Sequence, residues 1–151
     1  KPERFNSVHK KIIDSGHACI KWSDFKSLED HINVLLIDTL GDLPFFYSAS
    51  DIAFVGGSLF SIGGHNLLEP ASFGTPVITG PSLQNVKEIS TELIEVGGLL
   101  VVKNDQELSV QLNELFADDS KKDQMVSAAD KVMNDNKGAI ENIMKLIKPF
   151  I

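Results

Sequence analysis

The sequence predicts an α/β protein with a doubly wound parallel sheet, and three observations carry this prediction. Short apolar runs, of the length of buried strands, alternate with longer stretches in which apolar residues recur at helical spacing. Nearly every run is followed by a helical stretch, an order that produces parallel strands covered by helices on both faces. Gly16, Gly74 and Gly97 stand where helices are expected to end.

The first helix is expected near the N-terminus, ending at Gly16, because a glycine adopts the left-handed conformation that closes a helix. Its apolar face consists of Phe5, Val8, Ile12 and Ile13. Two strands and a short helix are expected over residues 17–22, 32–37 and 43–50. Pro44 lies in the first turn of this short helix, where its missing N–H group costs little.

The remaining elements continue the alternation. Strands are expected over residues 52–55, 76–79 and 99–102. Helices are expected over residues 66–73, 85–96, 105–116, 120–134 and 138–147. Asp105 is predicted to be the N-cap of the third of these helices, and the charged stretch 118–123 is interpreted as a solvated turn.

Composition excludes several classes of function. A net charge of −7 argues against a nucleic-acid partner, because a phosphate backbone binds basic faces. Cys19 is the only cysteine, so we expect no disulfide and no cysteine-based zinc site, and we interpret Cys19 as a core residue. No apolar stretch approaches the roughly 20 residues of a membrane span. The histidines are scattered, and we expect no metal and no cofactor.

Two glycine pairs are the most informative feature of the chain. Gly56-Gly57-Ser58 follows the strand expected over residues 52–55, and Gly63-Gly64-His65 precedes a helix that Asn66 can cap. Backbone N–H groups free of side chains, together with a helix N-terminus, favour a bound phosphate. The spacing matches neither the Walker loop nor Gly-x-Gly-x-x-Gly. The pattern therefore predicts a nucleotide or phosphate site of another lineage at the carboxyl edge of the sheet, where ligands of such sheets collect.

Each candidate residue also has a structural interpretation. Asn66 and Glu69 match a capping box, while Glu69 is equally suited to accept two ribose hydroxyls. The glycine pairs can be tight turns. Ser58 and Ser61 either donate to phosphate oxygens or satisfy their own loop. His65 either faces a ligand or is an ordinary hydrogen-bonding residue.

A second candidate segment spans residues 38–42, after the strand expected over 32–37. Thr39 or Asp42 can cap the helix that starts near Leu43. The same loop can instead offer backbone groups to a base or a sugar. No Ser-His-Asp order and no pair of inward carboxylates stands out, so we assign no catalytic residue within this chain.

These residues together resemble the C-terminal half of the 3-deoxy-D-manno-octulosonic acid (Kdo) transferases, which are GT-B glycosyltransferases. The most specific match is residues 63–70, Gly-Gly-His-Asn-Leu-Leu-Glu-Pro. The other matching segments are residues 2–5, 38–43, 47, 49–58, 74–77 and 80–81. The resemblance covers essentially the whole chain.

The resemblance implies a Rossmann-like fold, the C-terminal half of a GT-B enzyme, with residues 1–151 forming a single donor-nucleotide domain. It implies a CMP site, with Glu69 as the ribose ligand, made of Leu40, Gly41, Asp42, Gly57, Ser58, Gly64, His65, Asn66, Leu67, Leu68 and Glu69. The implied activity is transfer of Kdo from CMP-Kdo to lipid A precursor in lipopolysaccharide biosynthesis. The intact enzyme would work at the cytoplasmic face of the bacterial inner membrane.

The resemblance also indicates what lies elsewhere. The family's general base is a glutamate of an N-terminal domain, which also carries the membrane anchor and the acceptor site. That domain is absent from this chain, so we expect this portion to be soluble and inactive alone.

Two departures from the family pattern are visible. Leu40-Gly41-Asp42 stands where the family has Met-Gly-Glu, and the family's Pro-Arg-His before residues 2–5 is missing, which removes an arginine expected to neutralise the donor phosphate. Two alternatives remain open: the nucleotide half of another GT-B enzyme, such as a UDP-sugar transferase or 2-epimerase, and a non-catalytic interaction domain. A preference for cytidine or for uridine distinguishes a Kdo transferase from a UDP-sugar enzyme.

Overall fold

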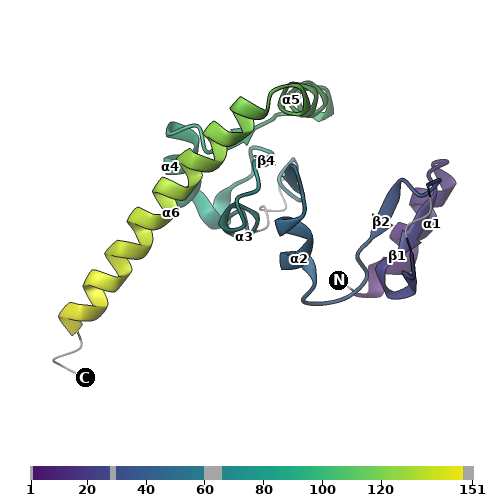
Figure 1. Cartoon of the computed structure of the whole chain (residues 1–151), viewed down its shortest axis with the longest axis horizontal. Helices are drawn as coiled ribbons and strands as arrows, with labels where there is room; N and C mark the ends of the chain where they lie inside the picture. The colour runs from purple at the N-terminus through teal and green to yellow at the C-terminus, as the bar shows by residue number, and fades with distance from the viewer. Residues whose placement is uncertain (1, 28–29, 60–65, 148–151) are drawn as a thin grey trace. The chain divides into compact units, whose positions relative to one another are not determined.

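The structure is a computed structural model that describes residues 2–27, 30–59 and 66–147 (Figure 1). The chain divides into two compact units, Lys1–Phe46 and Tyr47–Ile151. Each unit contains parallel strands connected through helices, so the predicted α/β class is confirmed.

The first unit is a small parallel sheet with one long helix. A 3-10 turn, η1 (Pro2–Arg4), leads into α1 (Phe5–Asp14), which ends before Gly16 at a φ of +87°. β1 (Cys19–Lys21) pairs in parallel with β2 (Val34–Leu36), in the register Cys19 to Val34. Between these strands lies η2 (Trp22–Asp24). The predicted helix and both predicted strands are confirmed, with shorter strands than expected.

An aromatic cluster packs the first unit, where no described residue is fully buried. The Trp22 ring lies 5.0 Å from the Phe25 ring and 5.1 Å from the Phe46 ring, between centroids. Phe45 packs edge-on against Phe46 at 5.3 Å. Both of these phenylalanines come from α2 (Leu43–Ser48), whose last residues, Tyr47 and Ser48, belong to the second unit.

The second unit is built on a three-stranded parallel sheet in the order β3-β4-β5. Its strands are β3 (Ala53–Val55), β4 (Val77–Thr79) and β5 (Leu99–Val101). Every residue of the central strand β4 is buried, because helices cover both faces of the sheet. Val77 packs into one apolar cluster with Leu67 and Leu93, and Ile78 packs into a second with Leu115 and Met125.

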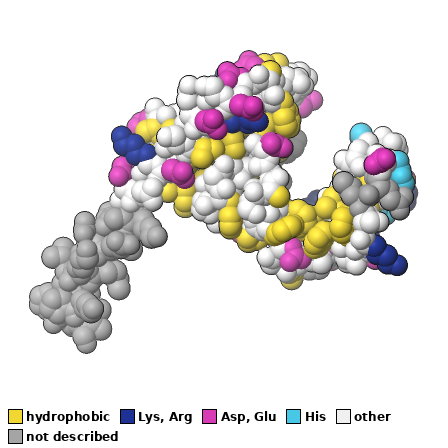
Figure 2. Space-filling view, viewed as in Figure 1, with side chains coloured by type: hydrophobic (Ala, Val, Ile, Leu, Met, Phe, Trp, Pro, Cys, Tyr) yellow, Lys and Arg dark blue, Asp and Glu magenta, His cyan; other side chains and the backbone are white. Residues whose placement is uncertain are grey.

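The helices of this unit follow the predicted order. They are α3 (Leu68–Ser72), α4 (Lys87–Glu95) after the 3-10 turn η3 (Gln84–Val86), α5 (Asp105–Ala117) and α6 (Asp119–Ile147). Several Asp and Glu side chains are scattered over the face of this unit that Figure 2 shows.

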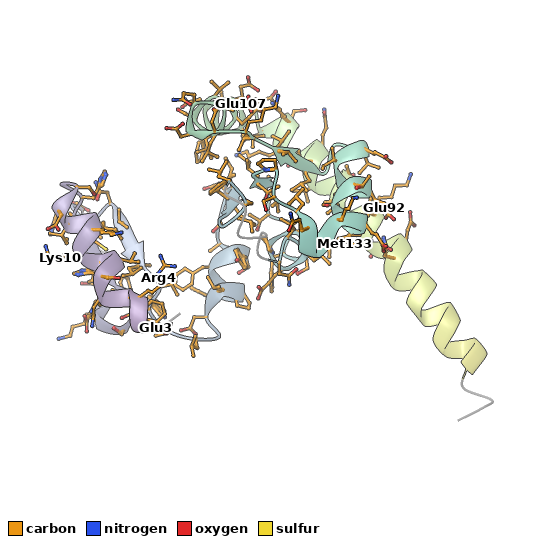
Figure 3. The ribbon with its side chains drawn as sticks, turned by 180° about the vertical axis from the view of Figure 1, so that it is seen from behind. Glu3, Arg4, Lys10, Glu92, Glu107 and Met133 are labelled. Atoms are coloured by element: carbon orange, nitrogen blue, oxygen red, sulfur yellow. The ribbon has the colours of Figure 1, made fainter. Side chains whose placement is uncertain are left out.

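α6 is one continuous helix of 29 residues, so the prediction of two helices over residues 120–134 and 138–147 is wrong. The charged stretch 118–123, interpreted as a turn, is mostly its first turn and a half. Gly138 costs a helix interior about 1 kcal/mol, which does not end a helix that contains no proline. α6 contacts α3, α4 and α5. Figure 3 shows Glu92 of α4 beside Met133 of α6, and the Glu92 carboxylate accepts from the Asn136 amide at 3.0 Å.

The N-cap of α5 is Asn104, not the predicted Asp105. Asn104 is extended, and its side-chain oxygen accepts from the N–H of Glu107 at 2.8 Å. The Glu107 carboxylate reaches back to the N–H of Lys103, also at 2.8 Å. A reciprocal cap of the kind considered for Asn66 and Glu69 at α3 is therefore found at the start of α5.

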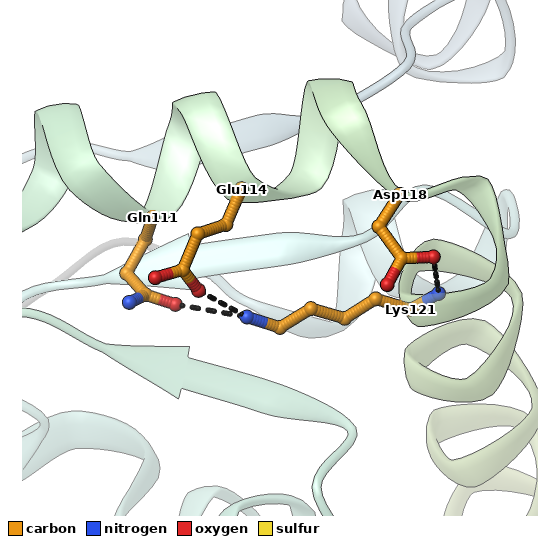
Figure 4. Close-up of polar contacts among 4 residues, drawn as sticks. All are labelled: Gln111, Glu114, Asp118 and Lys121. Carbon is orange, nitrogen blue, oxygen red and sulfur yellow. Dashed lines mark hydrogen bonds and ion pairs between the residues drawn. The ribbon is translucent and has the colours of Figure 1, made fainter.

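Polar contacts also join α5 to α6. The Lys121 ammonium lies 2.6 Å from the Glu114 carboxylate and 3.4 Å from the Gln111 amide oxygen (Figure 4). The N–H of Lys121 donates to Asp118 at 3.1 Å. Because the ion pair remains open to solvent, with Glu114 exposed and Lys121 half-buried, it orients the helix junction more than it stabilises it.

The described strands form two sheets, whereas the sequence predicted one. β2 pairs with β1, and β3 pairs with β4. The alternation of strand and helix specifies parallel strands, but hydrogen-bonding neighbours are decided by packing between distant segments.

Gly98 is a close-packing position that supplies a test of this fold. A Cβ at Gly98 would lie 2.8 Å from the backbone N and 2.9 Å from the Cα of Ala129 in α6. We predict that Gly98→Ala lowers the free energy of unfolding by about 1–3 kcal/mol, as overpacking does. Urea denaturation measures it. Gly56→Ala is the control, because nothing lies within 4 Å of a Cβ there and its φ is not positive. Equal stability of the two variants would contradict this packing of α6.

Candidate functional site

Ser58 joins the two loops that leave β3 and β4. Its hydroxyl donates to the Val55 carbonyl at 2.6 Å and accepts from the Gly80 N–H at 2.7 Å. Its own carbonyl accepts from the Ser82 N–H at 2.9 Å. Ser58 has no solvent exposure. We call these three hydrogen bonds the Ser58 clamp. They hold both loops at the carboxyl edge of the sheet.

The clamp requires glycine on both sides. Gly57 has a φ of +76°, which turns the chain sharply after β3. A Cβ at Gly80 would lie 2.4 Å from the carbonyl carbon of Ser58, a distance that no side chain tolerates. Of the two interpretations of Ser58, the structure favours the one in which its hydroxyl satisfies its own loop, because the single hydroxyl hydrogen is already donated to Val55.

The segment 66–69 opens α3. Asn66 is exposed, and its side-chain oxygen accepts from the N–H of Leu68 at 3.0 Å. Leu67 is completely buried and belongs to the apolar cluster on one face of the sheet. Leu68 is half-buried against the same cluster. The predicted capping box is only partly present, since Asn66 bonds the second residue after it and Leu67 occupies the N-cap position.

Glu69 lies in the first turn of α3 and is half-buried. No hydrogen bond or ion pair joins its carboxylate to another residue within the described ranges. Its negative charge acts on Tyr47: partial burial first, and then the charge of Glu69, raise the pKa of the Tyr47 phenol above its ordinary value of 10.0. A half-buried carboxylate with no hydrogen-bond or ion-pair partner among the described residues can accept hydroxyl groups.

Four of the residues that the sequence singles out lie outside the described residues. They are Ser61, Gly63, Gly64 and His65.

The segment 38–42 belongs to the first unit. Gly41 has a φ of +92°, and Leu40 is 79% exposed. The Thr39 hydroxyl donates to the Asp42 carboxylate, and the Asp42 carbonyl accepts from the Phe45 N–H at 3.1 Å as α2 begins. The Asp42 carbonyl thus accepts the first hydrogen bond of the helix, while the Asp42 side chain bonds Thr39.

Asp38 fixes the end of β2 to the end of β1. Its carboxylate accepts from the Ser23 hydroxyl at 2.7 Å and from the Ser23 N–H at 2.9 Å. These two hydrogen bonds hold the pKa of Asp38 below its ordinary value of 3.8. The loop that carries the predicted second contact segment therefore begins at an anchored residue.

Two pockets among the described residues of the second unit lie away from the predicted site residues. One of about 400 Å³ is lined by η3 and α4, from Gln84 to Ile89, and one of about 420 Å³ lies between β5 and α5. No predicted site residue lines either. Across the described residues, no group of His, Cys, Asp or Glu could hold a metal ion, and none of the helices is long and apolar enough to cross a membrane.

Sequence reasoning missed the hydroxyls around the clamp. The Thr79 and Ser82 hydroxyl oxygens are buried and have no hydrogen-bond partner in the described part of the chain. Nothing in the local sequence marks them, because their burial depends on the approach of the β3 and β4 loops. The sequence marks Tyr47 only as a residue that matches the family, although the charge of Glu69 acts on its phenol.

The comparisons with known proteins agree with this architecture. The structure superposes with a TM-score of 0.84 on the C-terminal CMP-Kdo binding domain of WaaA from Acinetobacter baumannii, at 31% identity, over 88% of this chain and 69% of that one. The fold is therefore that of a GT-B glycosyltransferase C-terminal domain. The family model for glycosyl transferases group 1 matches residues 11–132. The chain belongs to this glycosyltransferase family.

Curated relatives show which members of the glycosyltransferase family the chain resembles. The chain is 37% identical over 151 residues to the 3-deoxy-D-manno-octulosonic acid transferase of Haemophilus influenzae. The aligned region covers 99% of this chain and 35% of that protein. The chain is 43% identical over 115 residues to the enzyme of Aquifex aeolicus, covering 76% of this chain and 31% of that protein. The predicted resemblance to Kdo transferases is confirmed. The chain spans about a third of the length of these relatives.

The clamp can be tested by removing one hydroxyl. We predict that Ser58→Ala destabilises the chain by about 1–3 kcal/mol, because the buried Gly80 N–H loses its acceptor. Chemical denaturation measures the loss. Ser72→Ala is the matched control, since the exposed Ser72 hydroxyl only caps the carbonyl of Glu69. A Ser58→Ala variant as stable as this control would show that the clamp contributes nothing.

The first unit has a pH dependence that follows from Asp38. Because its folded pKa is lowered, its stabilising effect is present above 3.8 and is lost as the pH falls through the folded pKa. We predict that Asp38→Asn lowers the urea midpoint of Trp22 fluorescence at pH 7, and that this difference from the unmodified chain disappears in acid. Trp22 is the only tryptophan and lies next to Ser23.

Asp119→Asn is the control for this experiment. The pKa of Asp119 is also lowered, by the Lys122 ammonium, but Asp119 begins α6 in the second unit. Its substitution should leave the Trp22 transition unchanged. A difference between Asp38→Asn and the unmodified chain that persists unchanged at low pH would contradict the assignment.

Proposed function

We propose that this chain is the donor-nucleotide domain of an enzyme that transfers Kdo from CMP-Kdo to lipid A precursor. The observation that supports it most is the TM-score of 0.84 and 31% identity to a domain that is named for CMP-Kdo binding. The string Gly-Gly-His-Asn-Leu-Leu-Glu-Pro over residues 63–70 adds a narrow sequence match. Residues 1–151 then act as one donor domain.

In this proposal, backbone groups hold the donor phosphate. The loop held by the Ser58 clamp, the glycines at 63 and 64 and the start of α3 offer N–H donors to the anion. Glu69 accepts the ribose hydroxyls, and residues 40–42 are a second contact segment for the nucleotide. In an acidic chain whose site segments 56–58, 63–69 and 40–42 contain no lysine or arginine, this anion is bound mainly through backbone dipoles. We therefore expect the isolated chain to bind CMP weakly.

The reaction in the intact enzyme is a displacement at the anomeric carbon of Kdo. A general base outside this chain removes the proton of the acceptor hydroxyl, whose oxygen attacks the anomeric carbon. The bond from that carbon to the phosphate oxygen breaks, and CMP leaves with the electron pair. N–H donors around the phosphate stabilise the charge that develops on it. This chain therefore contributes donor positioning and leaving-group stabilisation.

Acceptor binding and location complete the proposal. The lipid A precursor binds to the part of the enzyme outside this chain, and the whole enzyme works at the cytoplasmic face of the bacterial inner membrane. Any membrane attachment lies in that other part.

Titration with CMP, with UMP as the control, tests the proposed function. We predict selective amide shifts with CMP at Gly41, Gly64 and residues 66–69 at millimolar concentration. Equal shifts with UMP would point to another nucleotide-dependent GT-B enzyme. If neither nucleotide binds, an autonomous donor site is excluded. Glu69→Gln should weaken CMP binding about tenfold, as loss of a charged hydrogen-bond acceptor does, whereas Ser72→Ala on the same helix should not.

A further inference from the structure

Tyr47 is held beside α3 by hydrogen bonds through Thr75. The Thr75 hydroxyl donates to the Tyr47 carbonyl at 2.7 Å, and the Thr75 N–H donates to the Pro70 carbonyl at 3.3 Å. Thr75 is only 4% exposed, so both bonds are shielded from water. Two hydrogen bonds thus connect Tyr47 to the residue that follows Glu69.

The side chains of Tyr47 and Glu69 offer one hydrogen-bond donor and one charged acceptor in the same part of the second unit. Both residues are half-buried, and no hydrogen bond joins the phenol or the carboxylate to another described residue. The two groups interact electrostatically, because the charge of Glu69 raises the pKa of the Tyr47 phenol, after the larger effect of burial. The raised pKa keeps the Tyr47 phenol an uncharged O–H donor at neutral pH.

This pair has the chemistry that recognises a vicinal diol. A carboxylate accepts hydrogen bonds from both hydroxyls of a diol, but it cannot donate to either oxygen. A phenol supplies the missing donor to one of the two oxygens. Half-burial strengthens each such bond relative to an exposed site, because less water competes for the same groups.

We propose that Tyr47 is a further donor-binding residue, which recognises the ribose diol of the nucleotide together with Glu69. This inference rests on the proposed function and extends it: the site distinguishes ribonucleotides from deoxyribonucleotides through a phenol that lies outside the Gly-Gly-His-Asn-Leu-Leu-Glu-Pro string of residues 63–70. Thr75 is the positioning residue that holds Tyr47 in place.

Nucleotide binding by the Tyr47→Phe chain tests the assignment. CMP should bind about fivefold more weakly than to the unmodified chain, the effect of one net hydrogen bond. The loss should vanish with either 2′-deoxy-CMP or 3′-deoxy-CMP, whichever lacks the hydroxyl that Tyr47 contacts. The same loss with all three nucleotides would reveal a merely structural role and overturn the inference. An unchanged thermal midpoint confirms that the variant is folded, since it keeps the ring.

A second measurement does not depend on nucleotide. Tyr47 is the only tyrosine of the chain, so phenolate absorbance during alkaline titration reports its pKa alone. Glu69→Gln should lower that pKa, while Glu88→Gln on α4 should leave it unchanged. A pKa insensitive to Glu69→Gln would overturn the pairing.

The two proposals fail in different ways. If the unmodified chain binds no CMP, the autonomous donor site and the ribose assignment in this chain both fall. If it binds CMP and Tyr47→Phe binds equally well, only the role of Tyr47 falls.

Discussion

The buried hydroxyl of Ser58 is the constraint on which the candidate site depends. It bridges the Val55 carbonyl and the Gly80 N–H, so the loops after β3 and β4 share one hydrogen-bonded arrangement. Both backbone groups would otherwise be buried without a partner, which costs more than an average hydrogen bond contributes. The shape of the carboxyl edge of the sheet is thus fixed from inside, by a residue with no solvent exposure.

This arrangement separates the residues that shape the site from those that face a ligand. Ser58, Gly80 and Leu67 are in the interior, where they set the course of the backbone. Glu69 and Tyr47 are half-buried and keep their polar groups available. An anion bound here would meet mainly N–H groups, and a sugar diol would meet side chains. Such N–H groups would allow a negatively charged protein to bind a negatively charged donor.

The two units rest on different physical supports. The second unit has a sheet whose central strand is buried on both faces, closed by the long helix α6 over Gly98. The first unit has no fully buried residue among those described and relies on packed aromatic rings and on the hydrogen bonds from Ser23 to Asp38. The hydrogen bonds that anchor loop 38–42 therefore depend on the ionisation of the Asp38 carboxyl group.

Local patterns in the sequence determined the class of fold, the strands, most helices and the position of the glycine turns. Apolar periodicity and positive-φ glycines such as Gly16, Gly74 and Gly97 act over a few residues, so they can be recognised without a structure. Residues that match a family motif, such as Glu69, could be identified in the same way.

Only the tertiary structure decided which strands pair, that α6 is continuous, that Asn104 caps α5, and that the Ser58 hydroxyl is already engaged. It also brought Tyr47 to Glu69 through Thr75, across 28 residues of sequence between the two bonded partners. These features arise from contacts between segments far apart in the chain. Their energies depend on burial and geometry that no local pattern contains.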